Sequence, residues 1–126
     1  MARVFVILGS INMLIAVALG AFGAHIVRDL ISGHYYTIYQ TGVDYHMFHS
    51  LGILLVGIIA LKIPGKQINW SGWLLFIGIV IFSGSLYVLS LTGISIIGAI
   101  TPIGGVSFLI GWLLLALAAY KKLGKE

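Results

Sequence analysis

The chain has 126 residues, of which 60% are hydrophobic and only 8% are charged, with a formal net charge of +4 and no Cys. Soluble domains carry about 25% charged residues, and a chain this short must expose much of its surface, so the composition excludes a water-soluble domain. The absence of Cys excludes a disulfide framework, a thiolate nucleophile and a Cys-based metal site.

Two segments in the first half of the chain are long enough to span a bilayer, since one span takes about 20 apolar residues. The first covers about residues 4–24. Its apolar part is long for a secretory signal, so we expect a retained helix. The second covers about residues 43–63, although its helix has room to start earlier, near Tyr35, and Pro64-Gly65 would end it.

The connection between these two segments is the longest in the chain. In it, apolar pairs at residues 26–27 and 30–31 flank Arg28 and Asp29. This pattern suits a short interfacial helix over about residues 26–32. Ser32-Gly33 would break that helix before the second span.

Residues 67–120 contain no Lys, Arg, Asp or Glu. That length accommodates two further spans and a short connection, which we expect at about residues 70–91 and 101–120. Thr101 and Pro102 form a good helix start, because Thr is a preferred N-cap and Pro suits the first helical position. The sequence therefore predicts one all-α domain over residues 1–126, a polytopic membrane protein built as a four-helix transmembrane bundle.

The basic residues predict how this bundle is oriented. Four spans place the N-terminus, the loop between the second and third spans and the C-terminus on one side, and only Arg28 lies on the other. The positive-inside rule then puts both termini in the cytoplasm, N-in and C-in. The same residues also suit contacts with anionic membrane lipids, and we expect no binding of nucleic acid. The cytoplasmic set is Arg3, Lys62, Lys66, Lys121, Lys122 and Lys125.

Small residues recur at helical spacing along the first and fourth spans. In lipid, helices associate through close packing and polar contacts rather than through the hydrophobic effect. We expect these positions to pack within the chain, with assembly into a homo-oligomer as the alternative. Asn12, an amide well inside the first span, is expected to bond across helices. The small residues are Ala16, Gly20 and Ala24 in the first span and Gly104, Gly111 and Ala118 in the fourth.

Polar residues gather in the half of the bundle that lies away from the Lys-rich ends. His46 and His49 are three residues apart and therefore share a helix face. Ionisable groups within a span usually face the bundle interior or a water-filled pocket. The polar cluster consists of His25, Gln40, Asp44, His46, His49, Ser83, Ser85 and Thr101.

Three interpretations of this cluster stay open. It forms a buried hydrogen-bond network between helices, without any cofactor; or it binds a metal through His25, His46 and His49 with Asp44, since imidazole and carboxylate suit zinc, copper or iron; or two of these histidines ligate haem. The helix start at residues 101–105 suits either a lipid phosphate or close helix packing. No nucleophile–base pair is evident, so we expect no catalytic residue and no enzyme.

Five motifs, in order along nearly the whole chain, resemble those of the YgdD/YwdK-type small membrane proteins, a family labelled as a domain of unknown function. The resemblance implies a four-span integral protein of the bacterial cytoplasmic membrane, but no reaction, substrate or catalytic residue. The motifs are residues 20–25 (GAFGAH), 39–50 (YQTGVDYHMFHS), 82–87 (FSGSLY), 100–105 (ITPIGG) and 111–112 (GW).

The function expected from the sequence is therefore non-enzymatic. We expect a membrane protein that acts through helix packing, self-association or lipid contacts, without a cofactor. The alternative is a small metal- or haem-binding membrane protein, or a transporter, that uses the outer His/Asp cluster.

Overall fold

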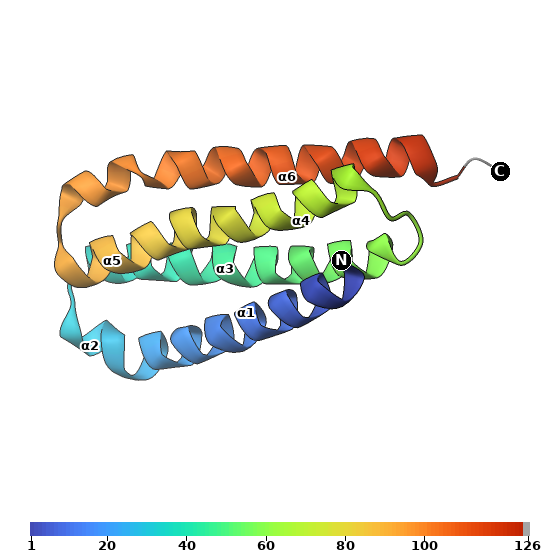
Figure 1. The fold of residues 1–126 in the computed structure, drawn as a ribbon. Helices are drawn as coiled ribbons and strands as arrows, with labels where there is room; N and C mark the ends of the chain where they lie inside the picture. Colours follow the sequence, from blue (N-terminus) through green and yellow to red (C-terminus); the bar gives the residue numbers. More distant parts are fainter. Residues whose placement is uncertain (125–126) are drawn as a thin grey trace.

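The computed structural model describes residues 1–124, and these form long helices that run side by side (Figure 1). Four helical spans are long and apolar enough to cross a membrane, and no strand occurs among the described residues. This confirms the predicted all-α, four-helix membrane fold. Lys125, one of the basic residues used to predict the orientation, lies outside the described residues. The spans are Ala2–Leu30, Gly33–Ala60, Lys66–Thr92 and Ser95–Lys122.

The first span is one continuous helical segment that extends beyond the predicted residue 24. It consists of α1 (Ala2–Phe22), the π-helical turn η1 (Gly23–Val27) and α2 (Arg28–Leu30). The predicted short helix over about residues 26–32 is helical only as far as Leu30, and it follows α1 without a break in the helix. The chain leaves the helix at Ile31, whose backbone is extended at φ −131° and ψ 163°.

The second span, α3 (Gly33–Ala60), starts about ten residues before the predicted residue 43. Ser32 caps its start by accepting a hydrogen bond from the backbone N–H of Tyr35 at 3.3 Å. The hydroxyls of Thr37 and Thr41 donate to carbonyls four residues earlier, at 3.0 and 3.1 Å. Polar side chains in this first part thus bond to the helix itself, so they lower its hydropathy without ending it.

The third span joins α4 (Lys66–Gly78), the π-helical turn η2 (Ile79–Ser83) and α5 (Gly84–Thr92). Gly93 ends it in the left-handed conformation, at φ 72°, as a glycine after a helix commonly does. The 3-10 turn η3 (Ser95–Ala99) leads into α6 (Thr101–Lys122). The predicted side-chain cap by Thr101 is not formed, because its hydroxyl lies 2.5 Å from that of Ser85 instead.

The helices are arranged with α3 near the centre (Figure 1). α1 packs on α3, α6 packs on α4 and η2, and α3 also contacts α4, η2 and α5. Both termini lie at the same end of the bundle as the loop after α3 (Figure 1). At that end Lys122 Nζ donates to the Pro64 carbonyl oxygen at 2.9 Å, which ties α6 to the loop.

The main apolar core fills the half of the bundle near the termini. Phe5, Ile53 and Leu75 are fully buried there, on three different spans. Glycines let the helices approach closely in this core. A Cβ placed on Gly9 would lie 2.7 Å from the backbone nitrogen of Leu54, so only Gly fits there.

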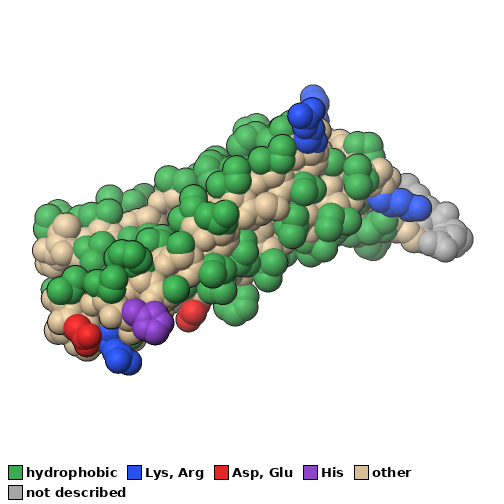
Figure 2. Space-filling model, turned by 90° about the horizontal axis from the view of Figure 1, so that it is seen from below, with side chains coloured by type: hydrophobic (Ala, Val, Ile, Leu, Met, Phe, Trp, Pro, Cys, Tyr) green, Lys and Arg blue, Asp and Glu red, His purple; other side chains and the backbone are tan. Residues whose placement is uncertain are grey.

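The outer surface is mostly apolar, as a bilayer requires. Hydrophobic side chains cover the length of the face drawn in Figure 2, with basic side chains toward one end and acidic, basic and His side chains toward the other. Leu14, Leu109 and Ile96 are among the most exposed, at 69%, 71% and 76%. A water-soluble chain of this size does not leave so continuous an apolar surface uncovered.

Candidate functional site

A hydrogen-bonded chain of three side chains crosses the bundle in the polar half. Asn12 of α1, His46 of α3 and Tyr87 of α5 take part. The Asn12 Oδ1 to His46 Nε2 distance is 3.2 Å, and the His46 Nδ1 to Tyr87 Oη distance is 2.9 Å. Both Asn12 and His46 are buried, at 8% and 4% exposure. Three of the four spans are therefore joined through one imidazole.

The hydrogen-bond partners of Asn12 and His46 determine which ring nitrogen of His46 carries the proton. Asn12 Nδ2 donates to the Leu8 carbonyl oxygen at 2.9 Å, so Asn12 Oδ1 faces His46 as an acceptor. A neutral imidazole has one N–H and one lone pair. His46 Nε2 must then donate to Asn12, and Nδ1 accepts the hydroxyl proton of Tyr87. Both His46 nitrogens are used inside the bundle.

Hydroxyl groups add further links between the helices by donating to backbone carbonyls. Ser83 of η2 donates to Gly42 of α3 at 2.7 Å, and Tyr39 of α3 donates to Leu19 of α1 at 2.6 Å. Ser71 of α4 and Ser107 of α6 donate to carbonyls of each other's helix, at Gly111 and Leu74, both at 2.7 Å. These bonds are the polar contacts that hold helices together in lipid.

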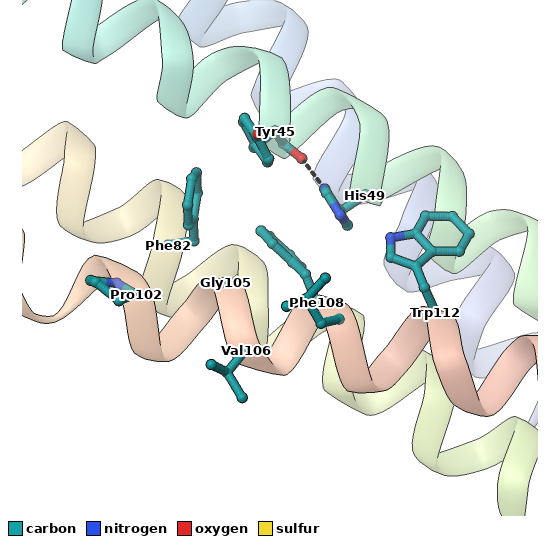
Figure 3. A pocket seen from close by; sticks show the side chains of 9 residues that line it. Tyr45, His49, Phe82, Pro102, Gly105, Val106, Phe108 and Trp112 are labelled. Carbon is teal, nitrogen blue, oxygen red and sulfur yellow. Dashed lines mark hydrogen bonds between the residues drawn. The ribbon is translucent and has the colours of Figure 1, made fainter.

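His49 has a different environment, in an aromatic pocket between α3 and α6 (Figure 3). The imidazole ring stacks on the Phe108 ring with centroids 3.5 Å apart, and Nδ1 lies 2.7 Å from the Tyr45 carbonyl oxygen. η2 carries Phe82 into the same pocket. The cavity has a volume of about 390 Å³ and is lined by Tyr45, His49, Phe82, Pro102, Gly105, Val106, Phe108, Leu109 and Trp112.

The other residues of the predicted polar cluster do not join these groups into one site. His25 and Asp44 are exposed on the helix surface. Gln40 Nε2 donates to the Tyr36 hydroxyl at 2.8 Å, within the first part of α3. Ser85 pairs with Thr101 on α6. The predicted cluster is thus several separate contacts.

The three histidines suggested as metal ligands are not brought together. His46 bonds Asn12 and Tyr87, His49 bonds its own helix and His25 is exposed. Across residues 1–124, no group of three His, Asp or Glu side chains is placed so that it could hold a metal ion. The geometry does not assemble the ligand set that the metal interpretation needs.

Most of the predicted small-residue positions lie between helices of the same chain. Ala16 and Ala118 are buried at 0% and 1% exposure. A Cβ on Gly20 would lie 3.2 Å from Val43, one on Gly111 would lie 2.9 Å from Leu75, and one on Gly104 would overlap the backbone of Phe82. Ala24 is exposed instead. Four-residue steps advance more than one turn of 3.6 residues, so a position eight residues after Ala16 has rotated off the contact face.

Several functional side chains of the interior were not among the predicted site residues. Tyr87 carries the third part of the His46 network, and its four-residue spacing from Ser83 is a signal that could have found it. Ser71 and Ser107 are each the single Ser of their helix, and only the helix pairing reveals their role. Phe108 and Trp112 resemble lipid-facing residues in the sequence, although they line the His49 pocket.

Comparison with known proteins agrees with this architecture. A family model described as "Protein of unknown function (DUF423)" matches residues 19–105. The chain is 54% identical over 122 residues to the UPF0382 membrane protein YwdK of Bacillus subtilis (strain 168), covering 96% of this chain and 99% of that protein.

A UPF0382 membrane protein of Staphylococcus epidermidis (strain ATCC 12228 / FDA PCI 1200) is 52% identical over 122 residues, covering 97% of this chain and 99% of that protein. No solved structure matches the chain. Both relatives are named membrane proteins, and the similarity extends over nearly the whole of each chain. The chain therefore belongs to the DUF423 (UPF0382) family of membrane proteins, a family of unknown function.

Proposed function

We propose that this protein is a non-enzymatic integral protein of the bacterial cytoplasmic membrane, with both termini in the cytoplasm. It acts through the packing of its helices and through contacts with membrane lipids. Self-association into a homo-oligomer is the alternative to lipid contact at the outer surface. Nucleic acid is not among the expected partners, because the basic residues lie beside the ends of the apolar spans.

The observation that carries the proposal is that the buried polar groups bond to one another and to the backbone inside the bundle. In residues 1–124, every fully buried side-chain nitrogen and oxygen atom has a hydrogen-bond partner. His46 is the clearest case, because Asn12 and Tyr87 occupy both of its nitrogens. A general base or a metal ligand needs a free lone pair, and His46 offers none. The buried network therefore supports a role in holding the helices together.

Lipid contact is supported by the outer surface. The first span exposes a row of large apolar side chains on the side away from α3, with Ile7, Ile11 and Leu14 at 49%, 52% and 69% exposure. The glycines and alanines that favour helix association are mostly used inside the chain. Lipid chains are therefore favoured over a second copy as the neighbours of this face.

Elemental analysis and a visible absorption spectrum of the detergent-purified protein test the proposal. We expect no stoichiometric metal and no haem band, and we expect His46→Ala to lower the thermal stability of the bundle. A stoichiometric metal or a haem band, lost when His25, His46 and His49 are all replaced by Ala, would reject the proposal in favour of a metal- or haem-binding protein.

A further inference from the structure

The pocket at His49 contains a hydrogen-bonding group that the fold itself does not use. His49 is more than nine-tenths buried, with 7% of its surface exposed. Its Nδ1 bonds the Tyr45 carbonyl oxygen, and its Nε2 has no hydrogen-bond partner among residues 1–124. Since no fully buried polar atom of these residues lacks a partner, Nε2 must remain accessible, and His49 lines the pocket.

The chemistry of Nε2 follows from the other ring nitrogen. A carbonyl oxygen only accepts hydrogen bonds, so Nδ1 of His49 carries the proton that is donated to Tyr45. Nε2 of the neutral ring therefore presents a lone pair. The pocket offers an acceptor to any molecule that enters it, and it favours a molecule that can donate one hydrogen bond.

A donor lies beside this acceptor. The ring centroids of His49 and Trp112 are 5.8 Å apart, and Figure 3 shows the indole nitrogen on the side of Trp112 that faces His49. Trp112 is 37% exposed, and its N–H takes part in none of the hydrogen bonds found among residues 1–124. Both residues line the pocket, and an N–H together with a lone pair matches a hydroxyl group, which both accepts and donates.

The walls and the position of the pocket define the rest of the ligand. Aromatic rings of Tyr45, Phe82, Phe108 and Trp112 surround a volume of about 390 Å³, and Gly105 contributes no side chain. Offset and edge-on contacts with such rings favour a flat ring system. Leu109, 71% exposed, and Val106, 53% exposed, form part of the lining on the outer surface. The pocket thus opens toward the lipid, near the middle of α3.

We infer that this pocket binds a lipid-dissolved, ring-bearing alcohol or phenol, whose hydroxyl donates to His49 Nε2 and accepts from the Trp112 N–H. The inference deepens the proposed lipid contacts, on which it rests for access from the bilayer. It is separate from the proposed role of the His46 network, because binding at His49 involves none of the atoms of that network.

Binding of 2-naphthol to the full chain in lipid nanodiscs tests the inference. Bound probe is measured by equilibrium dialysis above the amount taken up by protein-free nanodiscs. The comparison probe is 2-methoxynaphthalene, which keeps the rings but cannot donate a hydrogen bond. We expect saturable binding of one 2-naphthol per chain, with an affinity at least about tenfold higher than that of the methoxy compound.

Two variants localise the binding. His49→Phe keeps a stacking ring and removes the acceptor, so 2-naphthol should bind no better than the methoxy compound. Gly105→Leu should remove saturable binding of both probes, because a Cβ at residue 105 meets no atom closer than 3.9 Å and the longer side chain would fill the pocket. His25→Phe, at an exposed histidine, is the matched control and should change neither affinity.

Three results would overturn the inference: uptake that rises linearly with probe concentration, equal affinities for the two probes, or a preference for 2-naphthol that persists in His49→Phe. Each of these means that the pocket holds only water or lipid chains. None of them bears on the metal and haem measurements, so a failure here is distinguishable from a failure of the proposed function.

Discussion

His46 and His49 are one helical turn apart on α3, yet their rings have opposite surroundings. His46 is bonded on both nitrogens by residues of α1 and α5. His49 bonds only its own helix and leaves one nitrogen toward an aromatic pocket. The difference follows from which helix lies against each ring. Polar side chains of α1 and α5 meet His46, whereas α6 presents Phe108 and Trp112 to His49.

Replacing Tyr87 by Phe should destabilise the protein by about 1 kcal/mol, because His46 Nδ1 loses the hydroxyl that donates to it and no water replaces it easily within the bundle. The measurement is the midpoint of unfolding in mixed detergent micelles. Tyr120→Phe is the matched control, since Tyr120 is 85% exposed and makes no contact of this kind. Equal midpoints for the two variants would show that the Tyr87 hydroxyl contributes nothing.

The sequence allows the polar half of the bundle to be predicted, but not the pairing within it. His46 and His49 could be placed on one helix face by their spacing, and Asn12 could be expected to bond across helices. Which histidine meets Asn12 depends on the register of α1 against α3. That register is set by close contacts such as Gly9 against Leu54, which involve residues far apart in the chain.

At the scale of the helices, one π-helical turn explains features that hydropathy does not predict. η2 (Ile79–Ser83) carries Phe82 into the His49 pocket while Ser83 bonds the carbonyl of Gly42. A π turn inserts one residue into a helix and so rotates the side chains that follow it. Such an insertion leaves no mark in the apolar composition, and the sequence therefore predicted a regular span here.

The close approach of α6 to η2 depends on Gly104. A Cβ at this position would overlap the backbone of Phe82 and lie 2.7 Å from its Cβ. Gly104→Leu should therefore separate the two segments and lower stability by about 2 kcal/mol or more, as overpacking of a tight contact does. Thermal unfolding in detergent, followed by circular dichroism, measures the change.

Gly84→Ala is the control for this prediction. A Cβ at residue 84 meets no atom within 4 Å, and Ala favours the helix over Gly, so this variant should be unchanged or slightly more stable. If Gly104→Leu also leaves the unfolding temperature unchanged, α6 does not pack on η2 as closely as described.

Gly93 ends the third span in a backbone conformation that disfavours any side chain. Its φ of 72° and ψ of 11° place it in the left-handed region, where other residues cost about 1 kcal/mol or more. Gly93→Ala is expected to lower stability by about that amount in the same unfolding measurement. Gly98→Ala, in the neighbouring turn η3 (Ser95–Ala99), has no such conformation and only ordinary contacts, so it should have a small effect.

Across the whole molecule, most basic residues and the main apolar core lie in the same half of the bundle, the half near the termini. The apolar core occupies the half near the termini, where Lys62, Lys66 and Lys122 mark the helix ends. The hydrogen-bond network and the aromatic pocket occupy the rest, toward the end that carries Arg28. The positive-inside rule relates this asymmetry to the two sides of the membrane, because Lys and Arg are retained in the cytoplasm.

Labelling of single Cys variants in intact cells tests this orientation, and the absence of native Cys makes the experiment direct. Gly33→Cys lies at the start of α3, where a Cβ meets no atom within 4 Å, and Leu123→Cys follows α6. With both termini in the cytoplasm, a membrane-impermeant maleimide should label residue 33 in intact cells and residue 123 only after the cells are permeabilised. The opposite pattern would place the Lys-rich end outside the cell, and the positive-inside argument would then be wrong for this protein.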